Sequence, residues 1–196
     1  MGYNVDAETN PTVGGAFAQI GLSDIYIYAG HGAEGRLEFY NYNNHLYGAI
    51  LANENMDLNI YNSMYINQQQ NNKFANAKCV LYMACEAGAT YTGTNGSYNL
   101  VDETFNKGAH YVLGITTKIQ SFQVDDWLGF FVQRLTEGYD IKECVRFANE
   151  QSGVLQIPTG QYIYNEVTQT YEQIYNPHNG LPIHHIGDDT QYLNLQ

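Results

Sequence analysis

The sequence predicts an α/β fold with a mostly parallel sheet and helices on both faces. Three apolar runs of strand length, at residues 25–29, 79–84 and 110–115, are rich in β-branched and aromatic side chains. Two stretches with apolar residues three and four positions apart, at 124–135 and 141–148, predict amphipathic helices. Apolar strands that alternate with such helices are typical of a parallel sheet between two helical layers. We therefore expect a three-layer sandwich.

The remaining segments predict shorter elements, bounded by glycine- and asparagine-rich turns. In chain order we expect a strand at 3–5, a helix at 12–20 ended by Gly21, a hairpin of 36–40 with 46–51, a short helix within 53–76, a loop from Gly88 to Ser97, a helix at 99–106, and a hairpin around Tyr162 and Tyr171.

Size and composition are those of one globular domain, which we assign to residues 1–196. The net charge of −12 argues against nucleic acid and anionic membranes as partners. No apolar run approaches the roughly 18 residues of a membrane helix, and no signal-peptide pattern is visible. Cys79, Cys85 and Cys144 are an odd number without a pairing pattern, so we expect free thiols and a cytoplasmic location.

A histidine and a cysteine follow two of the predicted parallel strands. His31 comes soon after the strand at 25–29, and Cys85 comes directly after the strand at 79–84. Carboxyl ends of parallel strands meet at one edge of a sheet, where reactive groups collect. A neighbouring imidazole can take up the thiol proton and leave the nucleophilic thiolate. We expect the N–H groups of Gly32 and Cys85 to hold an oxyanion.

The same two strand ends resemble a known family. Tyr28–Gly32 and Val80–Gly88 are similar to the two catalytic blocks of the caspase-like (clan CD) cysteine peptidases, and closest in pattern to bacterial CHAT and gingipain-like members. In that family one apolar strand ends in His-Gly and a later one in Ala-Cys. The resemblance implies a thiol protease that cleaves peptide or protein substrates with a His31/Cys85 dyad. It implies no cofactor, although some members bind calcium.

Two departures from the family pattern matter. Met83 stands where the caspase signature has glutamine, and two residues separate Cys85 from Gly88. We therefore do not carry over the caspase preference for aspartate before the cut bond. The family also has a strand and a helix before the counterpart of residues 3–5. From this we expect a sheet without the family's first strand, in a domain that contacts other domains of a longer polypeptide.

The resemblance places the substrate pocket beside the nucleophile, in the turn after His31 and at the following strand ends. An acidic pocket favours lysine or arginine before the cut bond, whereas Lys118 and Arg36 would favour aspartate or glutamate. We expect the basic preference. The candidate substrate-binding residues are Glu34, Glu86, Thr116, Thr117, Asp125 and Asp126.

Three alternatives remain open from the residues alone. One is a catalytically inactive caspase-like domain that serves as a protein-interaction module. A second is a dinucleotide site, because Gly30, Gly32 and Gly35 satisfy G-x-G-x-x-G after a strand; that motif needs a following helix, whereas 36–40 has a strand pattern. The third, a metal site that would use His178, His184 and His185, is disfavoured because adjacent residues of an extended segment point to opposite faces.

Overall fold

The computed structural model describes residues 5–165 and 169–190. Its elements are α1 (Val13–Leu22), β1 (Ile25–Ala33), β2 (Arg36–Tyr40), β3 (Leu46–Leu51), β4 (Ser63–Tyr65), β5 (Cys79–Ala84), β6 (Tyr91–Gly93), β7 (Gly96–Tyr98), α2 (Leu100–Asn106), β8 (Tyr111–Ile115), α3 (Ser121–Thr136), α4 (Ile141–Gln151), β9 (Val154–Asn165), β10 (Thr170–Asn179) and β11 (Ile183–Gly187).

A seven-stranded mixed sheet in the order β11-β8-β5-β1-β2-β3-β4 forms the centre of the described chain. β1, β5 and β8 pair in parallel, as do β3 and β4, while β2 and β11 run in the opposite direction. Most strands therefore share one direction, as expected. β1, β5 and β8 correspond to the three apolar runs that the sequence predicts as strands, but β1 continues beyond the predicted run to Ala33.

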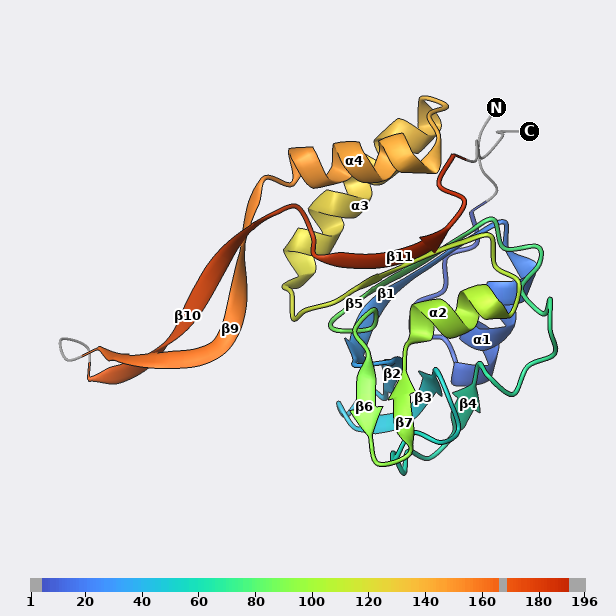
Figure 1. Cartoon of the computed structure of the whole chain (residues 1–196), viewed down its shortest axis with the longest axis horizontal. Coiled ribbons are helices and arrows are strands. Elements are labelled where there is room, and N and C mark those ends of the chain that lie inside the picture. Colours follow the sequence, from blue (N-terminus) through green and yellow to red (C-terminus); the bar gives the residue numbers. More distant parts are fainter. Residues whose placement is uncertain (1–4, 166–168, 191–196) are drawn as a thin grey trace.

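Helices cover both faces of the sheet, which makes the fold a three-layer α/β sandwich. Figure 1 shows α3 and α4 on one side and α1 and α2 on the other. The side chains of β5 alternate between two apolar clusters: Val80, Tyr82 and Ala84 pack with α1 and α2. Those of Cys79, Leu81 and Met83 pack with α3 and α4. All six residues of β5 are buried. Because its side chains alternate, the face of the sheet that each residue of the strand occupies is known.

The predicted short helix within 53–76 is wrong. This segment is a series of turns around β4, and Ile66 and Phe74 anchor it in the core. Asn62 and Asn72 have φ angles of 54° and 64°, a left-handed conformation that asparagine adopts more readily than most residues and that a continuous helix excludes.

Three smaller expectations also differ from the structure. α1 continues through Gly21 to Leu22 and is capped by Ser23; Gly21 is needed because a Cβ there would lie 2.9 Å from the carbonyl oxygen of Lys73. The expected loop from 88 to 97 contains the β6–β7 hairpin. Of the strand expected at 3–5, residues 3 and 4 lie outside the described residues, and Val5 is not in a strand.

The hairpin expected near the end of the chain is a long two-stranded arm. β9 and β10 pair only with each other, and Figure 1 shows them projecting from the rest of the molecule. The base of the arm is closed by the N–H of Gly180, which donates to the carbonyl of Gly153 at 2.9 Å. Beyond it, the carbonyl of Pro182 accepts the N–H of Thr116 at 3.0 Å, so the arm leaves the body beside the carboxyl end of β8.

None of the helices in the described ranges is long and apolar enough to cross a membrane.

Candidate active site

The parallel pairing of β1 and β5 places His31 beside Cys85. The register runs from Ile25 opposite Cys79 to Gly30 opposite Ala84, so His31 and Cys85 are the next residues along the two strands. Successive strand side chains alternate between faces. His31 and Cys85 therefore have the same parity as Ile25 and Cys79, which belong to the face that α3 and α4 cover. Cys85 directly follows β5 as predicted, whereas His31 lies within β1, because this strand continues to Ala33 by pairing with β2. The two residues still occupy neighbouring positions on adjacent strands and lie on one face.

Gly32 lies where the backbone of β1 meets the backbone after β5. A Cβ at this position would be 2.8 Å from the Cβ of Ala84 and 2.9 Å from the carbonyl oxygen of Cys85. Both separations are shorter than real Cβ contacts, so only glycine fits without a shift. The close approach brings the two predicted oxyanion donors, the N–H groups of Gly32 and Cys85, into adjoining segments of backbone.

The turn after the cysteine is strained and tightly packed. Glu86 has a φ of 55°, which is rare for a residue with a side chain, and such strain often occurs at functional sites. Its N–H donates to the carbonyl of Thr117 at 3.0 Å, and the N–H of Gly88 donates to Ile115 at 2.8 Å. Gly88 lies directly on Gly114 of β8, since a Cβ on Gly88 would be 2.3 Å from the Gly114 carbonyl oxygen.

The sulfur of Cys85 is partly buried and contacts the loop that follows β8. The N–H of Ile119 donates to Sγ at 3.4 Å, and the thiol donates to the Ile119 carbonyl at 3.4 Å. A thiolate can still accept the hydrogen bond from the Ile119 N–H. The bond to the Ile119 carbonyl forms only when the thiol is protonated, because it needs the S–H as donor. Sequence reasoning missed Ile119, because its role is carried by backbone atoms and depends on the path of the loop.

The other two cysteines have a different environment. Cys79, at the start of β5, is fully buried, and burial raises the pKa of its thiol well above the usual range. Cys144 lies on the buried side of α4, and burial raises its pKa to about 12. Both are packed as expected, and Cys85 is the cysteine that solvent can reach.

The imidazole of His31 is exposed and packs against β2. Its ring centroid lies 4.7 Å from that of Tyr40, with the two planes tilted by 56°. The hydroxyl of Tyr28 donates to the carbonyl of Glu38 at 2.8 Å and also lies 3.3 Å from that of His31. The backbone of the histidine is therefore fixed, while its ring lies exposed against Tyr40.

The structure brings some of the predicted pocket residues to the cysteine and leaves others apart. Glu86 and Thr117 lie directly beside Cys85, joined by a backbone hydrogen bond. The hydroxyl of Thr116 turns to the carbonyl of Pro182 at 3.2 Å. Exposed positions are occupied by Glu34, in the β1–β2 turn, and by Asp125 and Asp126, in the second turn of α3. No hydrogen bond among the described residues links these three carboxylates to Cys85.

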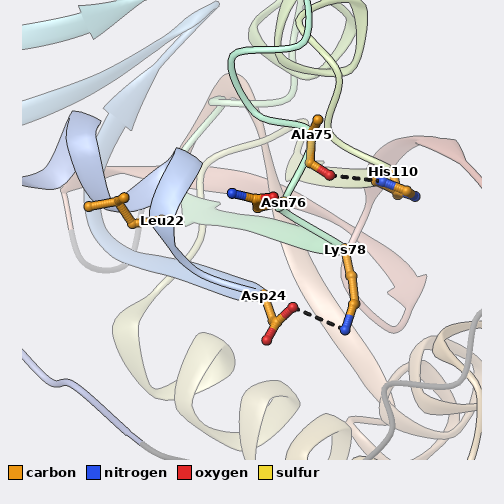
Figure 2. Close-up of a pocket in the computed structure, with 6 residues that line it drawn as sticks. All are labelled: Leu22, Asp24, Ala75, Asn76, Lys78 and His110. Carbon is orange, nitrogen blue, oxygen red and sulfur yellow. Dashed lines mark hydrogen bonds and ion pairs between the residues drawn. The ribbon is translucent and has the colours of Figure 1, made fainter.

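A hollow of about 420 Å³ lies at the opposite edge of the sheet (Figure 2). Asp24, Lys78 and His110, which line it, precede β1, β5 and β8 respectively. Lys78 Nζ lies 3.0 Å from a carboxylate oxygen of Asp24, and His110 Nε2 lies 3.0 Å from the Ala75 carbonyl oxygen. These polar groups are paired with protein atoms, and the hollow is remote from Cys85.

Two of the alternatives lose support from the geometry. Strand β2 follows Gly35, so the helix N-terminus that a dinucleotide motif requires is not formed there. Within residues 5–165 and 169–190, no group of three or more His, Cys, Asp or Glu side chains is arranged to hold a metal ion. His184 instead pairs with Asp102, with Nε2 2.8 Å from the carboxylate oxygen.

Comparison of the chain with protein-family models, with curated proteins and with solved structures finds no match. The function is therefore argued from the site itself.

Proposed function

We propose that the protein is a caspase-like cysteine endopeptidase in which Cys85 is the nucleophile and His31 the general acid and base. The single observation that carries this proposal is the β1–β5 register, which sets the histidine and the cysteine side by side on one face of the sheet. Partial exposure of Cys85 and the N–H of Ile119 at its sulfur are consistent with a thiolate that substrate can reach.

In the proposed reaction, Sγ of Cys85 attacks the carbonyl carbon of the peptide bond and a C–S bond forms. The N–H groups of Gly32 and Cys85 hold the oxyanion, a contribution of roughly 3–4 kcal/mol for each donor. His31 takes the thiol proton and gives it to the departing amine as the C–N bond breaks. Water then attacks the thioester while His31 accepts its proton, and the acid and the thiol are released.

The charges near Cys85 support a preference for lysine or arginine before the cut bond. Glu86 is adjacent to the nucleophile, and its carboxylate can pair with a basic side chain. Arg36, which we considered as a determinant of the opposite preference, is neutralised: its Nε lies 2.7 Å from a carboxylate oxygen of Glu38, and its side chain is 20% exposed. Lys118 is thus left as the nearby cation opposing a basic substrate.

A peptide library with each amino acid before the cut bond tests the proposal, with wild type, Cys85→Ala and Cys144→Ala compared. We expect cleavage after Lys or Arg by wild type and Cys144→Ala, and a loss of about 10³-fold or more in Cys85→Ala. Cys144→Ala is the matched control, because it removes a buried thiol elsewhere. Equal rates in all three proteins, or no cleavage by wild type, would contradict the assignment.

A second candidate is the inactive interaction module, with which the contacts of Cys85 are equally compatible. Both hydrogen bonds described at its sulfur are to the backbone of Ile119, which suits a structural thiol as well as a resting nucleophile. Reaction with iodoacetamide near neutral pH separates the two functions. A nucleophile paired with His31 is alkylated rapidly and loses that reactivity in His31→Ala, whereas a structural thiol reacts slowly in both proteins.

A further inference from the structure

The geometry points to Glu38 and Tyr40 of β2 as positioning residues that fix the orientation of the imidazole of His31. This inference rests on the proposed function and supplies the group that holds the histidine. The resemblance between the chain and caspase-like peptidases indicates no such residue, and sequence analysis identified none.

The pairing of β1 with β2 sets Glu38 directly opposite His31. Directly opposed residues of antiparallel strands project from the same face, with Cβ atoms about 4.5–5.5 Å apart. The neighbours of Glu38 on β2, Leu37 and Phe39, are buried in the cluster on the α1 and α2 face. Glu38 and Tyr40 therefore share the opposite face with His31, and the ring contact between His31 and Tyr40 agrees with this assignment.

The carboxylate of Glu38 is held at both oxygens. Arg36 Nε donates to Oε1 at 2.7 Å, and the hydroxyl of Tyr40 donates to Oε2 at 3.0 Å. The Glu38 side chain is only 11% exposed, so these bonds are shielded from water and fix the position of the acid. Burial, and then the hydrogen bond to Glu38, raise the pKa of Tyr40, which keeps its phenol protonated as a donor.

A rigid Tyr40 ring limits the orientations open to the imidazole. The hydroxyl bond to Glu38 prevents the phenol ring from swinging out, and the imidazole lies against that ring. During the reaction His31 carries a proton and a positive charge. The aromatic ring of Tyr40 beside the imidazole stabilises that charge, and Glu38 holds the ring in place. Tyr40 and Glu38 thus act through His31, without touching the substrate.

The test compares Tyr40→Leu, Tyr40→Phe and Glu38→Gln with wild type, with Glu143→Gln as the matched control. Glu143 is also a glutamate paired with an arginine, Arg146, but on α4. We expect Tyr40→Leu to lower kcat by about 10- to 100-fold with KM within about twofold, because a displaced His31 slows chemistry without weakening substrate binding. Tyr40→Phe keeps the ring, so its kcat should fall less than that of Tyr40→Leu. The kcat of Glu38→Gln should lie between those of the two Tyr40 variants, and the kcat of Glu143→Gln should equal that of wild type.

A second readout is independent of catalysis. In an NMR spectrum, the ring nitrogens of His31 report which of them carries the proton, and contacts between ring protons report the Tyr40 neighbour. We expect both signatures to change in Tyr40→Leu, and the proton distribution to change in Glu38→Gln. Wild-type signatures in both variants would overturn the positioning role, even in a protein without peptidase activity. Altered signatures in a protein that cleaves nothing would overturn the proposed function and leave the positioning role intact.

Discussion

The two edges of the central sheet carry similar side chains in opposite arrangements. β1, β5 and β8 begin at the edge where Asp24, Lys78 and His110 lie, and they end at the edge with Cys85 and His31. Each edge has a histidine, and β5 itself has a cysteine at its first position and another directly after its last. The amino edge has a hollow of about 420 Å³, whereas the carboxyl edge has the partly exposed Cys85 and the strained turn after it.

Backbone geometry explains why the carboxyl edge is the better candidate. At the amino edge, the polar groups near the hollow bond to one another and to neighbouring carbonyls, so they anchor the strand starts. At the carboxyl edge, β1 turns toward β2 while the chain after β5 turns toward β8, and the two paths separate beside Cys85. Open α/β sheets bind ligands at such points of separation. Strand direction therefore favours the carboxyl edge even though the hollow described above lies at the amino edge.

The comparison between the two edges of the sheet is tested most strongly by substituting the histidine at each edge, His31 and His110. His31→Ala should lower kcat/KM by about 10³-fold, because the general acid and base is removed. His110→Ala changes the same residue type at the other edge and should leave kcat/KM within about twofold. Both are measured on the best substrate from the peptide library. An equal loss in the two variants would mean that the edges do not differ in function.

The comparison of the two edges is sharpened by the reactivity of Cys79, at the start of β5, and of Cys85, directly after its end. Cys85 should be alkylated at pH 8 in the folded protein at least about a hundredfold faster than Cys79 or Cys144, as followed by mass spectrometry of peptides. Burial raises the pKa of Cys144 to about 12, so at pH 8 about one molecule in 10⁴ carries its thiolate.

The sign of the pH effect on stability follows from the same pKa. A folded thiol pKa of about 12, above the unfolded value of about 8.5, gives a stabilising contribution that is complete below pH 8.5. This contribution to the free energy of unfolding is lost as the pH rises toward 12. Cys79 and Cys144 should therefore react with an alkylating reagent only in alkali, or when a denaturant unfolds the protein. Rapid labelling of either thiol at pH 8 in the folded protein would contradict their burial.

The smallest effect is expected for two glycine substitutions, which change the free energy of unfolding and not the catalytic residues. Gly88→Ala places a Cβ 2.3 Å from the Gly114 carbonyl oxygen and should reduce the free energy of unfolding by about 3 kcal/mol. Gly129→Ala, in α3, meets nothing within 4 Å and should increase it by up to about 1 kcal/mol. Urea denaturation measures both. A Gly88→Ala protein as stable as wild type would show that the turn after Cys85 is not tightly packed.

The parts of the fold that sequence predicted are those governed by local apolar pattern. β5 is a continuous apolar run and α4 repeats Ile141, Cys144, Val145 and Ala148 on one side, and both are found where expected. Because Cys85 directly follows such a run, its position at the end of β5 was also predictable, whereas His31, expected after the strand at 25–29, lies within the longer β1. Their adjacency depends on the strand order, which the sequence did not predict and which places β1 beside β5.

The parts that sequence did not predict depend on contacts between distant residues. The β6–β7 hairpin is held by Asp57, which accepts the N–H of Thr94 at 2.8 Å and the amide of Asn95 at 2.6 Å. Nothing within 88–97 indicates that partner. Tyr40 and Glu38 read from sequence as ordinary strand residues, and their place beside His31 follows only from the β1–β2 register.

The contact between Gly88 and Gly114 has a consequence for how this molecule can change over time. Each glycine occupies the volume that a side chain on the other would need. A larger residue at one position cannot be accommodated by a smaller one at its partner, because no residue is smaller than glycine. The crossing of these two backbones is therefore closed to paired compensating substitutions, and sequence change at this point has to come from the residues around it.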